Sequence, residues 1–178
     1  MACDITSGFQ LGCRDNAGGV RKVYILGDAG AEITAVTTAG TFAEIDSMTG
    51  TGNFYEFELV KQTSTYAETI NASLENGTVF YQQDLTLVFH KMEAEKRNQI
   101  KLLSQAPDLK VVFEDNNGKQ FLLGQLNGLS VSAGTIGTGT AFGDRNGYEI
   151  TLTGLEPEPA QELDGTLSTI TLTGITVS

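Results

Sequence analysis

The sequence predicts a mainly β fold: an antiparallel β-sandwich or barrel with one flanking α-helix. Two observations support this prediction. Many short stretches alternate apolar and polar residues between turn residues, and a single amphipathic helical stretch lies in the middle. The 178 residues include 21 Gly but only 3 Pro, which favours tight turns over a proline-rich disordered tail. We expect one domain over residues 1–178, with residues 160–178 as a candidate C-terminal extension.

The part of the chain before the helix is expected to be rich in strands. A glycine turn leads into a first strand near residues 20–25. Residues 27–52 are rich in small and polar side chains and are expected to form an exposed loop or a long hairpin. Residues 54–60 alternate as a strand does, and residues 66–74 and 79–89 are expected to pair through an Asn-Gly turn.

One helix is expected over residues 91–105, and Pro107 ends it. The side chains that fall on one stripe of this helix are Met92, Lys96, Ile100 and Leu103. Most of the charged side chains lie outside that stripe. The pattern therefore predicts a helix that packs one face against the sheets.

Strands resume after the helix. Residues 109–114 and 121–123 are expected to form a hairpin, followed by a short apolar piece at 129–133. Residues 134–140 contain too much Gly for a buried strand and are expected to form a flexible loop. Residues 148–153 alternate clearly and predict another strand.

The pentapeptide Ile-Thr-Leu-Thr-Gly occurs twice, at residues 150–154 and 170–174. An acidic link that contains Pro157 and Pro159 separates the two copies. Two copies do not make a repeat protein. We interpret the second copy as a further strand that pairs within the sheet or with a neighbouring subunit.

No catalytic residue, cofactor site or metal site is expected. His90 is the only histidine, so one chain cannot build a His-based acid–base pair or a two-His metal site. Cys3 and Cys13 lack the second ligand pair of a zinc site, and the glycine-rich stretch around Gly137 lacks the Lys-Ser or Lys-Thr of a phosphate loop. An enzyme is therefore the least favoured class.

The chain is acidic, with 22 acidic against 11 basic residues and a formal net charge of −11. The basic residues do not cluster, so ordinary nucleic-acid binding is disfavoured. No segment approaches the roughly 20 apolar residues that a membrane span needs, and the N-terminus lacks a signal-peptide pattern. We expect no membrane anchor.

Several segments carry a resemblance to a known family. They are residues 13–24 (CRDNAGGVRKVY), 66–70 (YAETI), 75–83 (ENGTVFYQQ), 85–89 (LTLVF), 98–103 (NQIKLL) and 143–157 (GDRNGYEITLTGLEP). In this order they resemble the tail tube proteins of phages that infect Bacteroidetes. These segments lie between residues 13 and 157, so the resemblance spans more than half of the chain, and residues beyond about 160 have no counterpart in it.

The resemblance implies six copies that close into a ring and rings that stack into a hollow tube for double-stranded DNA. Sheets of adjacent subunits would join around the lumen, and a long loop or hairpin would reach a neighbouring ring. Residues 27–53 and 134–142 are the candidates for such contacts. Further implied partners are tail proteins such as the tape measure and the tail terminator. The implied location is the tail of the virion, assembled in the cytoplasm of the bacterial host.

In a tube, acidic side chains that face the lumen would repel the DNA phosphates and let the genome slide. Screening confines this repulsion to about 8 Å at physiological salt, so it would act near the wall. The candidate lumen acids are Glu44, Asp46, Glu56 and Glu58.

Three other non-enzymatic functions share the strand-rich composition. A head–tail connector or capsid subunit would form rings that do not stack indefinitely. A virion decoration protein or a β-sandwich binding module would stay small in solution. The state of assembly distinguishes these alternatives from a tail tube.

Overall fold

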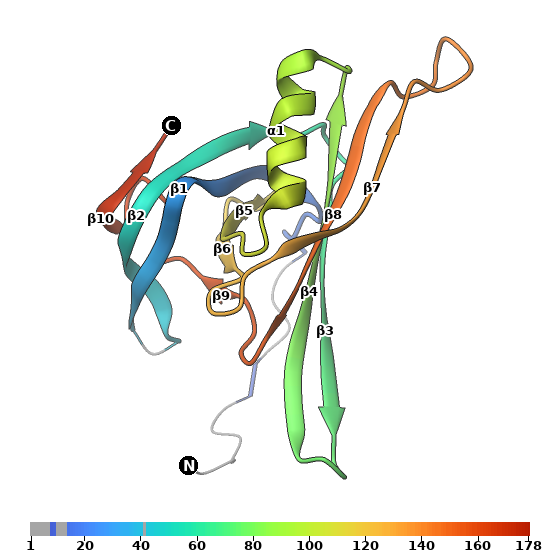
Figure 1. Cartoon of the computed structure of the whole chain (residues 1–178). Helices are drawn as coiled ribbons and strands as arrows, with labels where there is room; N and C mark the ends of the chain where they lie inside the picture. Colours follow the sequence, from blue (N-terminus) through green and yellow to red (C-terminus); the bar gives the residue numbers. More distant parts are fainter. Residues whose placement is uncertain (1–7, 10–13, 41) are drawn as a thin grey trace.

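The computed structural model describes residues 8–9, 14–40 and 42–178. Within these residues the chain forms ten strands and one helix, arranged in two sheets that face each other (Figure 1). The strand order is β10-β2-β1-β5-β6-β9 in the larger sheet and β3-β4-β8-β7 in the smaller one. The predicted mainly β fold with antiparallel sheets and one helix is confirmed.

The first two strands, β1 (Val20–Ala39) and β2 (Glu44–Glu58), form a long hairpin. Residues 27–52 are therefore part of a hairpin, and the alternative of an exposed loop is wrong. Ile45 and Met48 are fully buried, although glycines and register shifts interrupt the alternation around them. Small residues serve here to bend the strands while a few large side chains fill the core.

The smaller sheet contains β3 (Thr65–Ser73), β4 (Thr78–His90), β7 (Ser130–Gly137) and β8 (Gly147–Glu156). The predicted β3–β4 hairpin is confirmed, with Ser73 opposite Thr78. The predicted loop at 134–140 is wrong in its first half, because Gly134 to Gly137 pair with β8. An edge strand needs few side-chain contacts, so it tolerates these glycines.

Four shorter strands complete the larger sheet: β5 (Val111–Asp115), β6 (Gln120–Leu123), β9 (Gln161–Glu162) and β10 (Thr171–Val177). The second copy of the repeated pentapeptide lies at the start of β10, which pairs in parallel with β2. Of the two pairings that we considered for this copy, the structure shows the one within the sheet.

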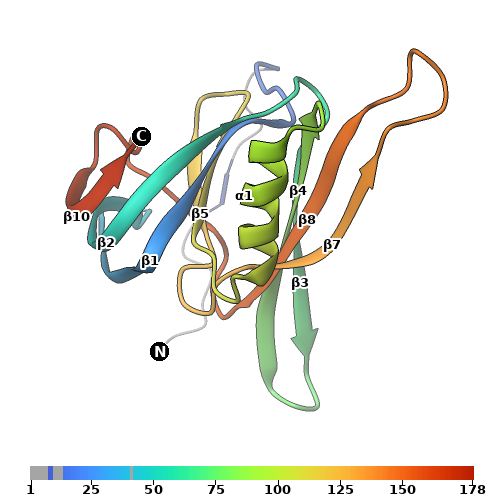
Figure 2. The same ribbon diagram turned by 45° about the horizontal axis from the view of Figure 1, so that its top comes forward.

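Helix α1 (Ala94–Gln105) runs along the gap between the sheets (Figure 2). Ile100 and Leu103 of the predicted stripe pack against the core, whereas Met92 precedes the helix and is 41% exposed. The N–H of Ala106 bonds to carbonyls of the last turn, and Pro107 follows. The helix is too short and too polar to cross a membrane.

Two hydrophobic cores lie on opposite faces of the larger sheet. The first lies between the sheets and includes Leu85, Leu152, Tyr148 and Val111. The second lies on the other face, where the C-terminal segment covers it. Its main members are Tyr24, Leu26, Ile45, Met48, Phe54, Val112, Leu122, Leu163, Leu167, Ile170 and Ile175. Among the described residues, the larger sheet is thus covered on both faces and the smaller sheet on one.

Candidate assembly surface

The smaller sheet has one buried face and one open face. Along β4, Leu85, Leu87 and Phe89 point into the first core, and Asp84 and Thr86 alternate with them. We call the second side the open face. Its central side chains are Gln82, Asp84, Thr86, Ser132, Thr151 and Thr153.

Side-chain hydrogen bonds link the strands across the open face. Thr153 Oγ1 donates to Asp84 Oδ1 at 2.6 Å, and Gln82 Nε2 donates to Asp84 Oδ2 at 2.9 Å. Ser132 Oγ lies 2.9 Å from Thr153 Oγ1, and the hydroxyls of Thr86 and Thr151 are 3.2 Å apart. Such cross-strand pairs stabilise a sheet without a second layer, so the centre of this face is polar and sparsely charged. Phe80 and Leu155 add exposed apolar side chains toward the hairpin end of the face.

Both outer strands of the smaller sheet have an edge that pairs with no other strand of the described residues. Natural proteins usually protect such edges with Lys, Pro or strong bulges. β3 and β7 contain neither Lys nor Pro, and β7 has one register shift, between Val131 and Ala133. The two edges are therefore suited to pairing with another strand.

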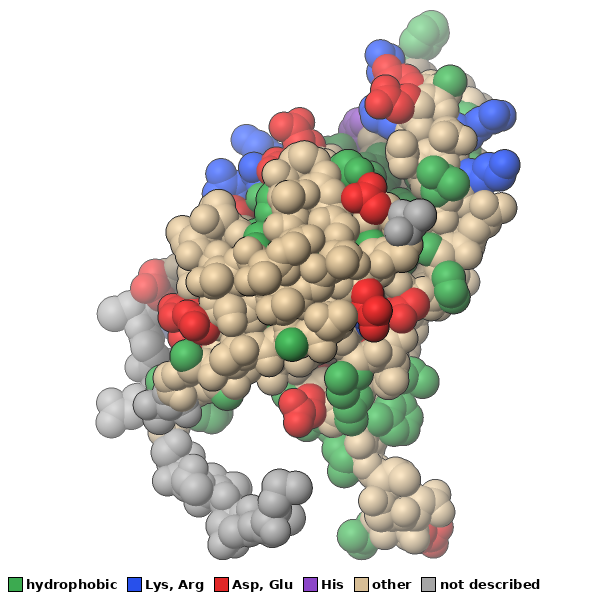
Figure 3. All heavy atoms as spheres, turned by 60° about the vertical axis from the view of Figure 1, so that its left-hand side comes forward, with side chains coloured by type: hydrophobic (Ala, Val, Ile, Leu, Met, Phe, Trp, Pro, Cys, Tyr) green, Lys and Arg blue, Asp and Glu red, His purple; other side chains and the backbone are tan. Residues whose placement is uncertain are grey.

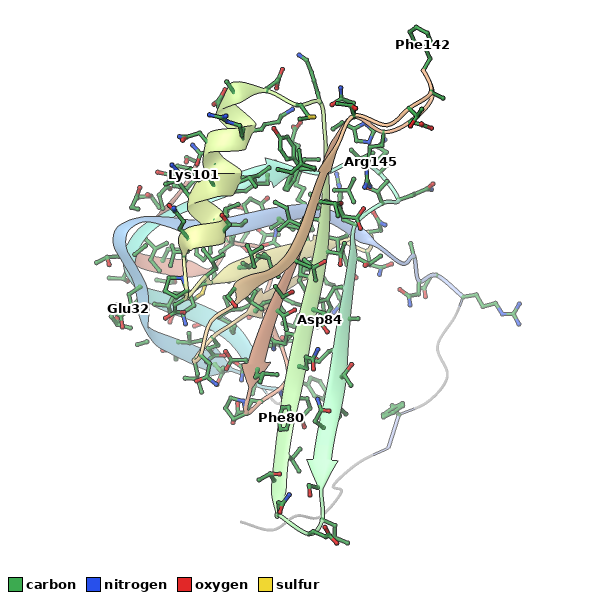
Figure 4. All side chains as sticks on the ribbon, turned by 45° about the vertical axis from the view of Figure 1, so that its right-hand side comes forward. Glu32, Phe80, Asp84, Lys101, Phe142 and Arg145 are labelled. Atoms are coloured by element: carbon green, nitrogen blue, oxygen red, sulfur yellow. The ribbon has the colours of Figure 1, made fainter. Side chains whose placement is uncertain are left out.

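The two edges project from opposite ends of the sheet (Figures 1 and 4). Tyr66, Leu85, Leu152 and Val131 lie level with one another across the four strands. From this level β3 runs toward the tip of the β3–β4 hairpin, and β7 runs the opposite way toward the loop at Phe142. The sheet is therefore staggered.

The buried carboxylate of Glu156, at the end of β8, fixes the position of the loop that precedes β7. Glu156 Oε1 accepts the backbone N–H groups of Asn127 at 2.8 Å and Gly128 at 3.2 Å, and Oε2 accepts that of Leu126 at 3.2 Å. Three N–H donors on one carboxylate are charge-assisted bonds that hold this loop firmly. These bonds fix the place where β7 begins beside β8, and thereby the stagger of the sheet.

The loop between β7 and β8 carries a fully exposed aromatic side chain, Phe142, at its tip (Figure 4). Below the tip, Asp144 Oδ2 accepts the N–H groups of Thr140 and Ala141, both at 2.7 Å. Arg145 forms an ion pair with Glu149 at the root of the loop. These contacts give the loop beyond β7 a defined turn.

We expect this turn to loosen in acid. The N–H of Ala141, and next that of Thr140, hold the pKa of Asp144 below its ordinary 3.8. A lowered carboxyl pKa stabilises the folded turn above the ordinary value, and this contribution is lost as the pH falls through the lowered pKa. Amide NMR shifts of residues 138–146 should therefore change with a midpoint below 3.8. Asp144→Asn should abolish that transition, and a midpoint above 3.8 would contradict the assignment.

The four candidate lumen acids all lie on β2, in the larger sheet. Glu44 and Asp46 stand at its beginning, whereas Glu56 and Glu58 stand at its end, so the structure does not bring the four together. Glu56 Oε1 forms an ion pair with Lys22 Nζ at 2.7 Å, and this contact raises the pKa of Lys22.

His90, the one histidine of the sequence, lies at the end of β4. His90 is exposed, and its carbonyl accepts Lys96 Nζ at 3.0 Å. No group of three or more His, Cys, Asp or Glu side chains among these residues could hold a metal ion. Two surface hollows of about 470 and 420 Å³ lie elsewhere, and His90 lines neither. Cys3 and Cys13 lie outside the described residues.

Sequence reasoning missed the open face and the two edges as a site. The alternation in residues 79–89 places Gln82, Asp84 and Thr86 on one face, so the open face had a signal. The two edges had no signal in the sequence, because no local pattern of residues determines the order of strands in a sheet. Comparison with protein families, with curated proteins and with solved structures finds no match.

Proposed function

We propose that this protein is the structural subunit of a phage tail tube, in which hexameric rings stack around a channel for double-stranded DNA. The observation that carries the proposal is the smaller sheet, with its polar open face and its two staggered, unprotected edges. The resemblance of the sequence to tail tube proteins supports the same function. Leu85 and Tyr148 lie in this one sheet, as a continuous wall requires.

The edges of two copies have compatible directions. Neighbouring strands of the smaller sheet are all antiparallel, so the two outermost of its four strands run in opposite directions. When two copies stand side by side in the same orientation, β3 of one lies antiparallel to β7 of the next. This contact is heterologous, and repeating it around a rotation axis closes a ring.

The stagger fits the strand tilt of a closed barrel. Within one copy, Ile136 lies level with Phe89 of β4. Thr65, the first residue of β3, pairs with Thr86, so the level of Ile136 lies three residues before the start of β3. Placing Ile136 opposite a core-face residue within β3, Tyr66 or Glu68, thus requires a shift of about four or six residues. That shift is about 13–20 Å along strands whose sheet is about 19 Å wide, a tilt of about 35–46°. Closed barrels have tilts of about 35–45°.

Six copies would contribute about 24 strands and a wall about 50 Å across. Barrels of about 16–18 strands already enclose an aqueous channel, so a ring of this size has an open lumen. The open face would line it, because the opposite face is buried in the first core. This face presents hydroxyl and amide groups, Asp84 and Glu149, and the apolar side chains of Phe80 and Leu155. It offers DNA phosphates few cations to bind.

In this proposal Asp84 and Glu149 join Glu44, Asp46, Glu56 and Glu58 as candidate lumen acids. The two sets lie on different sheets, so one experiment distinguishes them, as argued in the Discussion. The partners would be further copies, the tape measure, the tail terminator and the passing DNA. The site of action would be the virion tail, after assembly in the bacterial host.

Electron microscopy of the purified chain over a concentration series tests the proposal. We expect rings that stack into tubes with an open lumen as the concentration rises. Rings that never stack would instead indicate a head–tail connector. Particles that remain monomeric at every concentration, also after addition of preformed tube ends, would contradict the tail tube and favour a decoration protein or binding module.

A further inference from the structure

Beyond a polar step at Gln83 and Glu68, apolar side chains again lie on the core-facing side of the β3–β4 hairpin. Leu85 and Leu87 of β4 are buried in the first core. Two and three steps further toward the tip, the same side of the sheet carries Ile70 of β3 and Val79 of β4. Their exposed fractions are 65% and 56%. Apolar side chains at core-facing positions with no second layer mark an unpartnered sheet face.

The opposite edge of the sheet shows the same feature. Ile136 of β7 also occupies a core-facing position, since it pairs with buried Tyr148, and it is 58% exposed. The sheet therefore has exposed apolar side chains on its core face at both edges. Ile70 and Val79 lie on the β3–β4 hairpin, which extends past one end of the sheet. Ile136 lies on β7, which extends past the opposite end.

The hairpin is also nearly uncharged. Residues 69–83 include a single charged side chain, Glu75, in a chain of net charge −11. Figure 3 shows hydrophobic side chains gathered between the hairpin tip and the body. A second copy of this acidic chain could approach the hairpin without strong repulsion, whereas a basic partner would find little to attract it.

We propose that the core face of the β3–β4 hairpin packs on a second copy of the chain, beside Ile136 of that copy, so that the hydrophobic core continues between subunits. The inference rests on the edge-to-edge ring of the proposed function and adds its register. A shift of six residues sets Ile136 opposite Glu68, and Gly134 opposite Ile70.

Gly134 provides the space that this register needs. It has no side chain, and a Cβ at its position would meet only the carbonyl oxygen of Glu149, at 3.4 Å. The side chain of Ile70 from the neighbour would lie over this glycine and diagonally against Ile136. The alternative shift of four residues would place Glu68 over Gly134 and leave Ile70 without this pairing. That shift would set Ile136 opposite Tyr66, which already packs against the first core, whereas Ile70 is 65% exposed, so the larger shift covers more exposed apolar surface.

Charged substitutions at the two edges test the interface. Ile70→Asp and Ile136→Asp should each raise the protein concentration needed for ring formation by more than tenfold. Asn71→Asp is the matched control, because it adds the same charge to the same hairpin on its open face. Urea unfolding of the dilute variants should match wild type, since both isoleucines are exposed in the monomer.

Mixing the two variants gives the sharpest result. Each contact uses the hairpin of one copy and β7 of the next. The Ile136→Asp variant keeps an intact hairpin, and the Ile70→Asp variant keeps an intact β7. One copy of each variant can therefore form one intact interface. The dimer that results has a defective surface at each free end. We expect dimers and nothing larger in the mixture, by analytical ultracentrifugation. Each variant alone should remain monomeric at the same concentration.

Three outcomes would overturn the inference. If Ile70→Asp forms tubes at the wild-type concentration, the hairpin contact is wrong while the tail tube proposal stands. If the mixture remains monomeric while wild type forms rings, the two surfaces do not meet. If wild type itself never assembles, the proposed function fails and this interface fails with it.

Discussion

Replacing Phe54 by alanine is expected to lower the free energy of unfolding by about 3–5 kcal/mol, the range for large-to-small changes of buried Phe. Phe54 is 0% exposed and lies in the second core, on β2, among side chains of β1 and the C-terminal segment. The substitution removes an aromatic ring from a site that rigid strands surround, so little collapse can fill the cavity. Urea unfolding of the dilute monomer measures the change.

Phe42 supplies the matched control. It lies just before β2, and it is 84% exposed. Phe42→Ala should therefore change the free energy of unfolding by no more than about 0.5 kcal/mol. Equal effects of the two substitutions would contradict the burial of Phe54 in the second core.

Residues 27–52 show why an exposed loop could be expected where the structure has a hairpin. A half-buried strand is recognised by strict alternation, and β2 loses it at a bulge near Asp46 and at the glycines Gly50 and Gly52. A Cβ at Gly50 would overlap the carbonyl oxygen of Glu32, so only glycine permits this close pairing of β1 and β2. Small residues that allow strands to approach look, in one dimension, like residues of a loop.

Where alternation is intact, the sequence was sufficient. Residues 79–89 predicted β4, the Asn-Gly step predicted its hairpin with β3, and the apolar spacing of Ile100 and Leu103 predicted the packed side of α1. These features depend on neighbours in the chain. Which strands become sheet edges depends on the whole topology, so the candidate assembly surface was only partly predictable.

The repeated pentapeptide makes the same point within one chain. In β8 it lies between two antiparallel strands, and in β10 it pairs in parallel at the edge of the larger sheet. Both copies end in a glycine that lies against a backbone carbonyl, Gly154 against Gly128 and Gly174 against Gly50. Identical residues thus predict a strand and a close approach, while the partner is chosen by the rest of the fold.

In the proposed tube, charge reversal on the open face is expected to turn a lumen that DNA passes into one that retains DNA. Asp84→Lys with Glu149→Lys would place about 24 units of charge change in each hexameric ring, counting two units per site. Contacts of cations with phosphates dominate DNA affinity and make it steeply salt-dependent. Tubes of this variant should therefore hold a short duplex at about 50 mM salt and lose at least a thousandfold in affinity by about 200 mM.

Nuclease protection locates the DNA that such tubes retain. Glu44, Asp46, Glu56 and Glu58, changed to Lys together, form the comparison set on β2. DNA inside a tube is shielded from nuclease, whereas DNA on the outside is digested. If the open face lines the lumen, tubes with Asp84→Lys and Glu149→Lys protect the duplex from nuclease. The β2 variant then binds the duplex on the outside, where nuclease digests it. Protection by the β2 variant alone would assign the lumen to the larger sheet, and the open face would then face outward, where its polar ladder of hydroxyl groups would contact solvent.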